Sequence, residues 1–331
     1  MSTKNYKKDI LVIADKPNWA YYQIQQFIVR SISEEYNVYC DFLCYNLAKK
    51  SRRPSVLVQN FRGKRKYRKI KKGDNYDVVI YLGFYFLDLI KVRWTASNTI
   101  VGIYTDSFPP RNGVFCATKK DFLEHYFKSA DAMVCGSPSI VNIYKSIYSK
   151  CYFASLTYDT SLFSRETPRS INNSEKFIIG FTGQLDRDFK GFYTHITPAV
   201  ERLKKKYPGV VLKTRREGPF ETLPRFYDDV DLVIIASEAD AGPSLFMEAS
   251  LMGVPCISTK IGFVTEVLVD EINGYYVKRD VDDIYDKLLS LYQNREKLFV
   301  MSQRIRQDFI MGIGGNEMKN KWLEMLNNVL K

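Results

Sequence analysis

The sequence predicts an α/β protein with two doubly wound domains that face a cleft. Short apolar runs rich in β-branched residues alternate with longer amphipathic segments along the chain, which indicates alternating strands and helices. The short runs are apolar at nearly every position, as strands are when helices cover both faces of a parallel sheet. The chain has 331 residues, of which 45% are hydrophobic, so it has enough apolar material for two cores.

Ten segments have the composition of buried strands, six in the first half of the chain and four in the second. They span residues 9–15, 37–45, 76–83, 98–106, 131–137, 151–159, 176–184, 210–216, 231–237 and 254–260. Three further segments place apolar residues at helical spacing, namely 20–36, 191–207 and 243–253. Pro198 bends the second of these helices or marks an internal start. The tail is helical from about residue 300, with a break at 312–315.

A polar, proline-containing stretch without periodicity, residues 164–175, is typical of a linker. We therefore predict a first domain over 1–160 and a second over 161–310. The last helix, within 311–331, is expected to pack back on the first domain.

The positive charge of the chain is concentrated in one segment. The net charge is +12, and residues 49–72 contain twelve Lys or Arg and no Asp or Glu. Without these twelve, the 49 basic residues fall to 37, equal to the 37 acidic ones. Such a segment binds an anionic partner, which could be phospholipid headgroups, a phosphorylated acceptor or nucleic acid. The alternative is a solvated loop.

The remaining composition excludes several classes of protein. Six Cys without a CxxC pair and only two His fit neither a disulfide framework nor a zinc site. The longest apolar stretch, 78–90, is shorter than a membrane span and contains Asp88. We expect a cytoplasmic protein, at most peripheral at the cytosolic face of a membrane.

Two acids eight positions apart flank the start of the predicted helix 243–253. Asp240 precedes this helix, and Glu248 lies about a turn and a half inside it. Ligands of open α/β sheets bind beyond the carboxyl ends of the strands, and amides at a helix start form an anion site. Here the helix starts at Pro243, and the amides belong to Ser244, Leu245 and Phe246. A phosphate between two hydroxyl-rich groups describes a sugar nucleotide; the alternative is an acidic helix cap and a surface Glu.

The stretch 240–277 resembles the signature of retaining GT-B glycosyltransferases of family 4, the glycosyl transferases group 1. The matching positions, in order and spacing, are Glu248, Ala249, Gly253, Pro255, Gly262, Glu266, Asn273 and Gly274. The segments 155–164, 181–191 and 223–237 are also similar to segments of that family. The resemblance implies two Rossmann-like domains, the first on the acceptor side and the second binding a nucleotide-sugar donor. It also implies transfer with retention and no bound divalent cation.

The resemblance assigns roles to individual residues. Glu248 would bind the nucleotide ribose, Asp240 the donor sugar, and Lys190 the donor diphosphate. The rest of the implied nucleotide site is Gly183, Gln184, Arg187, Pro243, Ser244, Leu245 and Glu266. Two positions depart from the family, since Asp240 replaces a Glu and Gln184 replaces an Arg whose charge we expect Arg187 to supply.

The first domain departs further from the family. Relatives carry a His-Asp pair after the fourth strand, where this chain has Thr105 and Asp106. We expect Asp106 to contact donor or acceptor; the alternative is an Asp at a strand-end turn. Trp19 and Tyr21 follow the first strand and could face a sugar, although core packing is the favoured role.

These patterns predict an enzyme that transfers a hexosyl or related group from a nucleotide-sugar to a glycan, lipid-linked or cell-surface polymer acceptor. One alternative is a GT-B-like partner subunit that binds nucleotide without catalysis. A second is a nucleic-acid-binding protein that uses residues 49–72, although no nucleic-acid-binding module is recognisable.

Overall fold

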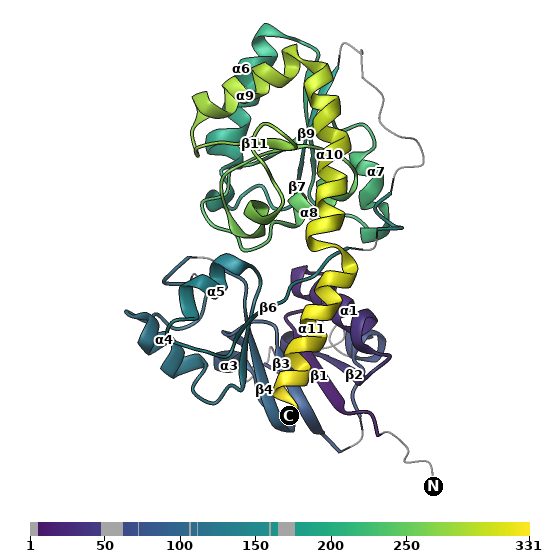
Figure 1. The fold of residues 1–331 in the computed structure, drawn as a ribbon, viewed down its shortest axis with the longest axis vertical. Helices are drawn as coiled ribbons and strands as arrows, with labels where there is room; N and C mark the ends of the chain where they lie inside the picture. The colour runs from purple at the N-terminus through teal and green to yellow at the C-terminus, as the bar shows by residue number, and fades with distance from the viewer. Residues whose placement is uncertain are drawn as a thin grey trace. The chain divides into compact units, whose positions relative to one another are not determined.

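A computed structural model describes residues 6–47, 62–71, 73–105, 107–110, 112–158, 160–164 and 176–331. The chain divides into two compact units (Figure 1). The first unit is Met1–Leu156 with Asn316–Lys331, and the second is Thr157–Gly315. Each unit contains one parallel sheet with helices, which confirms the predicted fold class.

The first unit is built on a six-stranded parallel sheet in the order β2-β1-β3-β4-β5-β6. The strands are β1 Asp9–Ala14, β2 Asn37–Phe42, β3 Asn75–Tyr81, β4 Thr95–Ile103, β5 Ala132–Cys135 and β6 Cys151–Phe153. In the central strand β1, residues 10–14 are fully buried, as the continuous apolar run predicts. Strand β6 is shorter than the predicted 151–159, and residues 154–158 have no regular structure.

Outside the basic segment, the helices that the described part of this unit contains are α1 Ala20–Ile32, α3 Phe86–Leu89, α4 Lys119–Tyr126, α5 Pro138–Tyr144 and α11 Gly315–Val329. Local sequence explains two of the helix starts. Thr118 and Asp121 form a capping box at α4, and the Ser137 hydroxyl accepts from the Ile140 amide at α5. Helix α11 buries Trp322 completely, and the indole Nε1 donates to the Ser155 carbonyl at 2.8 Å.

The described part of the basic segment, residues 62–71, is folded along the edge of the first sheet. Residues 62–67 form a helix. Lys69 then forms an isolated antiparallel β-bridge with Cys40 of β2. Arg68 forms an ion pair with the buried Asp41 at 2.8 Å. The segment therefore covers the edge strand β2, which would otherwise present unpaired backbone groups. Residues 49–61 and 72, the rest of the predicted basic segment, lie outside the described residues.

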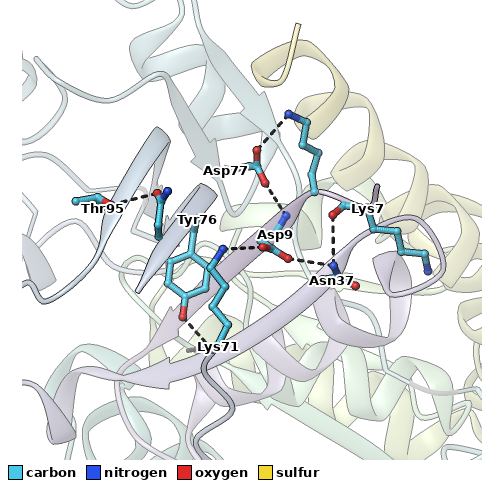
Figure 2. A network of polar contacts seen from close by, with 9 residues as sticks. Lys7, Asp9, Asn37, Lys71, Tyr76, Asp77 and Thr95 are labelled. Atoms are coloured by element: carbon cyan, nitrogen blue, oxygen red, sulfur yellow. Dashed lines mark hydrogen bonds and ion pairs between the residues drawn. The ribbon is translucent and has the colours of Figure 1, made fainter. Parts of the chain in front are cut away.

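A polar network joins the amino ends of β1, β2 and β3, and Lys71 is part of it (Figure 2). Asp9 accepts from Lys71 Nζ at 2.6 Å and from Asn37 Nδ2 at 3.0 Å. The Asp9 amide donates to Asp77 at 2.8 Å, and Asp77 also pairs with Lys8 at 3.1 Å. This network fixes Lys71 at the end of the sheet where the strands begin, opposite their carboxyl ends.

The second unit is built on a five-stranded parallel sheet in the order β11-β10-β9-β7-β8. The strands are β7 Phe177–Thr182, β8 Val210–Arg215, β9 Leu232–Ile235, β10 Cys256–Ser258 and β11 Gly274–Tyr276. The helices are α6 Thr197–Lys206, α7 Leu223–Tyr227, α8 Ser244–Leu251, α9 Val281–Gln293 and α10 Arg295–Ile313. The central helix α8 is buried almost throughout and packs on α10 (Figure 1).

The proline and glycine signals act locally as expected. Pro198 lies in the first turn of α6, which follows a π-helical turn at Phe192–Ile196, so it marks an internal start. Gly314 separates α10 from α11. No helix among the described residues is long and apolar enough to cross a bilayer.

Candidate active site

The predicted site residues of the second unit lie on loops at the carboxyl ends of its strands. Gly183 directly follows β7, Asp240 lies between β9 and α8, and Lys190 ends a short 3₁₀ turn, Asp188–Lys190. Carboxyl ends of parallel strands share one edge of a sheet, where open α/β folds bind ligands. The structure therefore brings these loops and α8 to one place.

Glu248 is the most buried acid of the site. Its side chain projects from α8, and the residue is 5% exposed. Its Oε2 accepts from the Tyr227 hydroxyl at 2.6 Å and from Thr182 Oγ1 at 3.1 Å. Burial raises the pKa of Glu248, and the two hydroxyl donors, with the charges of Lys190 and Arg215, oppose that rise.

Lys190 carries a half-buried positive charge within electrostatic range of this carboxylate. Burial lowers the pKa of Lys190, while the negative charges of Asp240 and Glu248 oppose the decrease and Arg187 adds to it. Gly183 has φ +112°, and a Cβ placed on it would lie 3.3 Å from Lys190 Nζ. The glycine therefore permits both the turn after β7 and the position of the ammonium group.

Asp240 is held in a turn before α8. Its Oδ1 accepts from the Gly242 amide at 3.1 Å, the geometry of an Asx turn. The loop packs closely on the next one, because a Cβ on Gly262 would lie 2.1 Å from the Ala241 carbonyl oxygen and Phe263 donates to the same oxygen at 3.0 Å. The side chain of Asp240 thus lies within electrostatic range of Lys190, as the effect on the Lys190 pKa indicates.

The amino end of α8 carries backbone donors, with one correction to the prediction. Pro243 occupies the cap position and the helix begins at Ser244. Among the described residues, the amides of Ser244 and Leu245 donate to no acceptor, whereas the Phe246 amide donates to the Pro243 carbonyl at 2.9 Å. Two amides rather than three are therefore available to an anion.

Three predicted residues lie at the periphery of this arrangement. Gln184, Arg187 and Glu266 are exposed. Arg187 is near enough to Lys190 to affect its pKa, and Glu266 ends a 3₁₀ turn, Gly262–Glu266, after β10. Asp106, the predicted contact in the first domain, lies outside the described residues. Within the described ranges, no three His, Cys, Asp or Glu side chains are grouped so that they could hold a metal ion.

A family model matches a part of the chain that includes Asp240 and Glu248 but not Gly183 or Lys190, and one curated relative matches a short stretch. Residues 217–308 match the model described as "Glycosyl transferases group 1". A stretch of 78 residues is 31% identical to the N-acetyl-alpha-D-glucosaminyl L-malate synthase of Bacillus anthracis. That stretch spans 23% of this chain and 20% of the relative.

Solved structures match nearly the whole chain. Anabaena Alr3699/HepE in complex with UDP and glucose has a TM-score of 0.66 at 10% identity, over 97% of this chain and 99% of that one. Sucrose-phosphate synthase from Thermosynechococcus elongatus has a TM-score of 0.69 at 11% identity, over 98% and 99%. A glycosyltransferase from Rickettsia africae has a TM-score of 0.63 at 14% identity, over 98% and 99%. The chain has the GT-B fold.

Several residues of this GT-B unit that shape the site were not identified from the sequence. Tyr227 and Thr182 hold Glu248, and burial raises the pKa of Tyr158 while the nearby Ser244 side chain opposes that rise. Thr182 directly precedes the glycine turn, and Tyr227 belongs to the family-like segment 223–237, so both carried a weak signal.

Arg279, which is far from Lys190 in the sequence, stabilises the loop that contains Lys190. Its Nε donates to the Ala236 carbonyl at 3.0 Å, and its Nη2 donates to the Asp188 carbonyl at 2.8 Å. Gly191, with φ +66°, approaches the same Ala236 carbonyl so closely that a Cβ would lie 2.8 Å from the oxygen. No local motif marks Arg279, because its partners belong to two loops far away in the sequence.

Proposed function

We propose that this protein is a retaining glycosyltransferase of family 4 that transfers a sugar from a nucleotide-sugar donor. The observation that supports the proposal most directly is the grouping of Lys190, Asp240 and Glu248 around the amino end of α8. A buried carboxylate, a half-buried ammonium and two available amides are suited to a diol and a diphosphate held side by side. The match of residues 217–308 to the group 1 model supports the same assignment.

In the proposed donor complex, Glu248 accepts hydrogen bonds from the ribose hydroxyls. The amides of Ser244 and Leu245, together with Lys190, face the diphosphate, and Asp240 contacts the donor sugar. Gly183 allows close approach of the backbone to phosphate. Arg187 and Glu266 complete the nucleotide site from its exposed side, as does Gln184.

The proposed chemistry breaks the bond between the sugar C1 and the diphosphate oxygen and forms a bond between C1 and the acceptor oxygen. Negative charge grows on the departing diphosphate, and Lys190 with the α8 amides stabilises it by fixed electrostatics. The acceptor hydroxyl gives its proton to the departing phosphate on the same face of the sugar, so configuration is retained. This scheme assigns the charge stabilisation to protein groups and needs no divalent cation.

The proposed acceptor is a glycan, a lipid-linked sugar or a cell-surface polymer, reached by a cytoplasmic enzyme at the inner face of a membrane. The basic segment supports this location. Arg62, Arg65 and Lys66 are exposed on the helix at 62–67, where they can meet anionic headgroups or an anionic acceptor.

The first test is thermal unfolding with a panel of UDP-, GDP-, ADP- and CMP-sugars, because a ligand that binds the folded state raises its stability. We expect the nucleotide-sugars of one base to raise the Tm of the protein. Turnover of that donor should be lost in Lys190→Ala and Glu248→Ala. Binding of a nucleotide-sugar without transfer of its sugar to any acceptor would favour a non-catalytic GT-B subunit. If no nucleotide-sugar binds, the proposed function is wrong.

A further inference from the structure

Three oxygen atoms form a closed triangle at the buried end of the site. They are Thr182 Oγ1, the Tyr227 hydroxyl and Glu248 Oε2, with separations of 3.1 Å, 2.6 Å and 3.1 Å. The three side chains come from β7, the last residue of α7, and α8. Tyr227 is fully buried, so its hydroxyl has no bulk water as an alternative partner.

Both hydroxyls of this triangle can donate to Glu248 Oε2, so this oxygen acts as a hydrogen-bond acceptor. The two hydroxyls carry two protons between them, and a carboxylate oxygen only accepts. Tyr227 donates to Oε2 over the shortest of the three distances, while Thr182 donates either to Oε2 or to the Tyr227 oxygen. In both arrangements the protein satisfies Oε2. The other oxygen, Oε1, makes no hydrogen bond with the described residues.

The surroundings of Glu248 make this support necessary. Burial favours the protonated acid and raises the pKa of Glu248. The groups that act on it are Tyr227 from α7, Thr182 from β7, Lys190 from the 3₁₀ turn and Arg215 from β8. Tyr158, which precedes the second sheet, is also within electrostatic range of Glu248. Among these groups, Tyr227 and Thr182 are the ones that bond directly to the carboxylate.

We propose that Tyr227, supported by Thr182, is a positioning residue that holds Glu248 by Oε2 and turns Oε1 toward the nucleotide ribose. This inference rests on the proposed function, since it assigns Glu248 to a ribose diol. It adds a residue pair that determines how strongly the protein distinguishes a ribonucleotide from a 2′-deoxyribonucleotide.

The test measures binding of UDP, GDP, ADP and CDP, each beside its 2′-deoxy counterpart, by calorimetry on the full chain. We expect the wild-type chain to bind the preferred ribonucleotide about tenfold more tightly than its deoxy form, as for loss of a hydrogen bond to a charged group. In Tyr227→Phe this preference should shrink to about twofold. The pH below which nucleotide binding is lost should rise by about one unit, because the Glu248 carboxylate loses a hydrogen-bond donor. With turnover, the KM for the donor should rise while kcat changes little.

Matched variants separate positioning from general damage to the fold. Thr182→Val should weaken the preference for the ribonucleotide over its 2′-deoxy form, and Thr182→Ser should keep it. These two variants replace Tyr227→Phe in the test if that variant does not fold. Tyr207→Phe is the control, because it removes a tyrosine hydroxyl of the same unit that accepts from Gln293 Nε2 at 3.5 Å, away from Glu248. In the background of Glu248→Gln, Tyr227→Phe should cause no additional loss of preference.

The outcomes are distinguishable. If the wild-type chain binds no nucleoside diphosphate, the proposed function fails and the positioning role fails with it. If the wild-type chain prefers the ribonucleotide and both Tyr227→Phe and Thr182→Val keep the full preference and the same acidic limit, the positioning role alone is wrong.

Discussion

The ammonium group of Lys190 lies directly beside the α-carbon of Gly183. A Cβ on Gly183 would stand 3.3 Å from Lys190 Nζ, and the glycine has φ +112°. The turn after β7 and the position of the Lys190 charge therefore depend on the same missing side chain. Glycine is needed here for two separable reasons, a left-handed backbone and a close contact.

Gly183→Ala should reduce both stability and donor binding. The backbone strain costs about 1–3 kcal/mol, and the Lys190 ammonium must shift by a few tenths of an ångström from its place in the proposed diphosphate site to clear the new methyl group. Gly73→Ala is the matched control, because Gly73 has φ +101° and a Cβ added there would meet no atom within 4 Å. Thermal unfolding and calorimetry with UDP should show a stability loss in both variants and a binding loss in Gly183→Ala alone. Equal UDP affinity in the two variants would contradict the proposed role of the contact.

Lys190→Met should lower kcat by about 10²- to 10³-fold, the range for removal of one group that stabilises developing charge. The wild-type enzyme should also lose activity on the alkaline side, because burial lowers the pKa of Lys190 and its charge is lost as pH rises through that value. A bound diphosphate favours the charged form, so the alkaline limit of kcat should lie at higher pH than that of kcat/KM. Rate profiles from pH 6 to 10 test this, and an unchanged alkaline limit in Lys190→Met would refute it.

Glu248→Gln should stabilise the protein while it weakens donor binding. The pKa of Glu248 is raised in the folded state, so folding is favoured below the unfolded pKa and that contribution is lost as pH rises through the folded value. At neutral pH the buried charge is therefore a cost, which the neutral amide removes. We expect a Tm about 2–4 °C higher at pH 7.5, as for ~1 kcal/mol in a domain of this size, and little gain at pH 4. A lower Tm at pH 7.5 would show that the carboxylate stabilises the fold.

Replacement of Arg62, Arg65 and Lys66 by Gln should weaken binding to phosphatidylglycerol vesicles at least tenfold, since each basic residue near an anionic surface contributes about 1 kcal/mol. Arg68 and Lys71 stay in place, because they pair with Asp41 and Asp9 and deletion of the segment would damage the fold. The control replaces the exposed Lys119, Lys120 and Lys128, which makes the same change in net charge. Vesicle sedimentation with phosphatidylglycerol and phosphatidylcholine measures the effect; equal retention of both triple variants on anionic vesicles would rule out a specific role for this helix.

Much of the fold was predictable because its signals are local. A continuous apolar run such as residues 10–14 is buried on both sides, and only a strand in a covered parallel sheet meets that requirement over so few residues. Helix α8 was predictable from Pro243 and from Gly253, which has φ +63°. Helix α9 is missing from the sequence-based prediction, although Asp280 caps it by accepting from two amides.

The candidate site was predictable where its residues form a motif and not where they meet through tertiary packing. Asp240 and Glu248 lie on one loop and helix, so their spacing carries the signal. Tyr227 reaches Glu248 from another helix, and Arg279 reaches Asp188 across 91 positions. Such partners are defined by how the loops fold on each other, which no local pattern contains. The charge run 49–72 indicated an anionic partner but not that Arg68 is committed to a buried ion pair.

The path of the chain through its two units affects the order in which they can be completed during synthesis. The first unit takes its last helix, α11, from residues that are translated after the entire second unit. That helix supplies the fully buried Trp322 and its bond to Ser155. Since domains generally fold as units while the ribosome extends the chain, the second unit can mature while the first still exposes the apolar surface that α11 will cover. The earlier-made half would then be the later one to reach its native state, and the one in greater need of a chaperone.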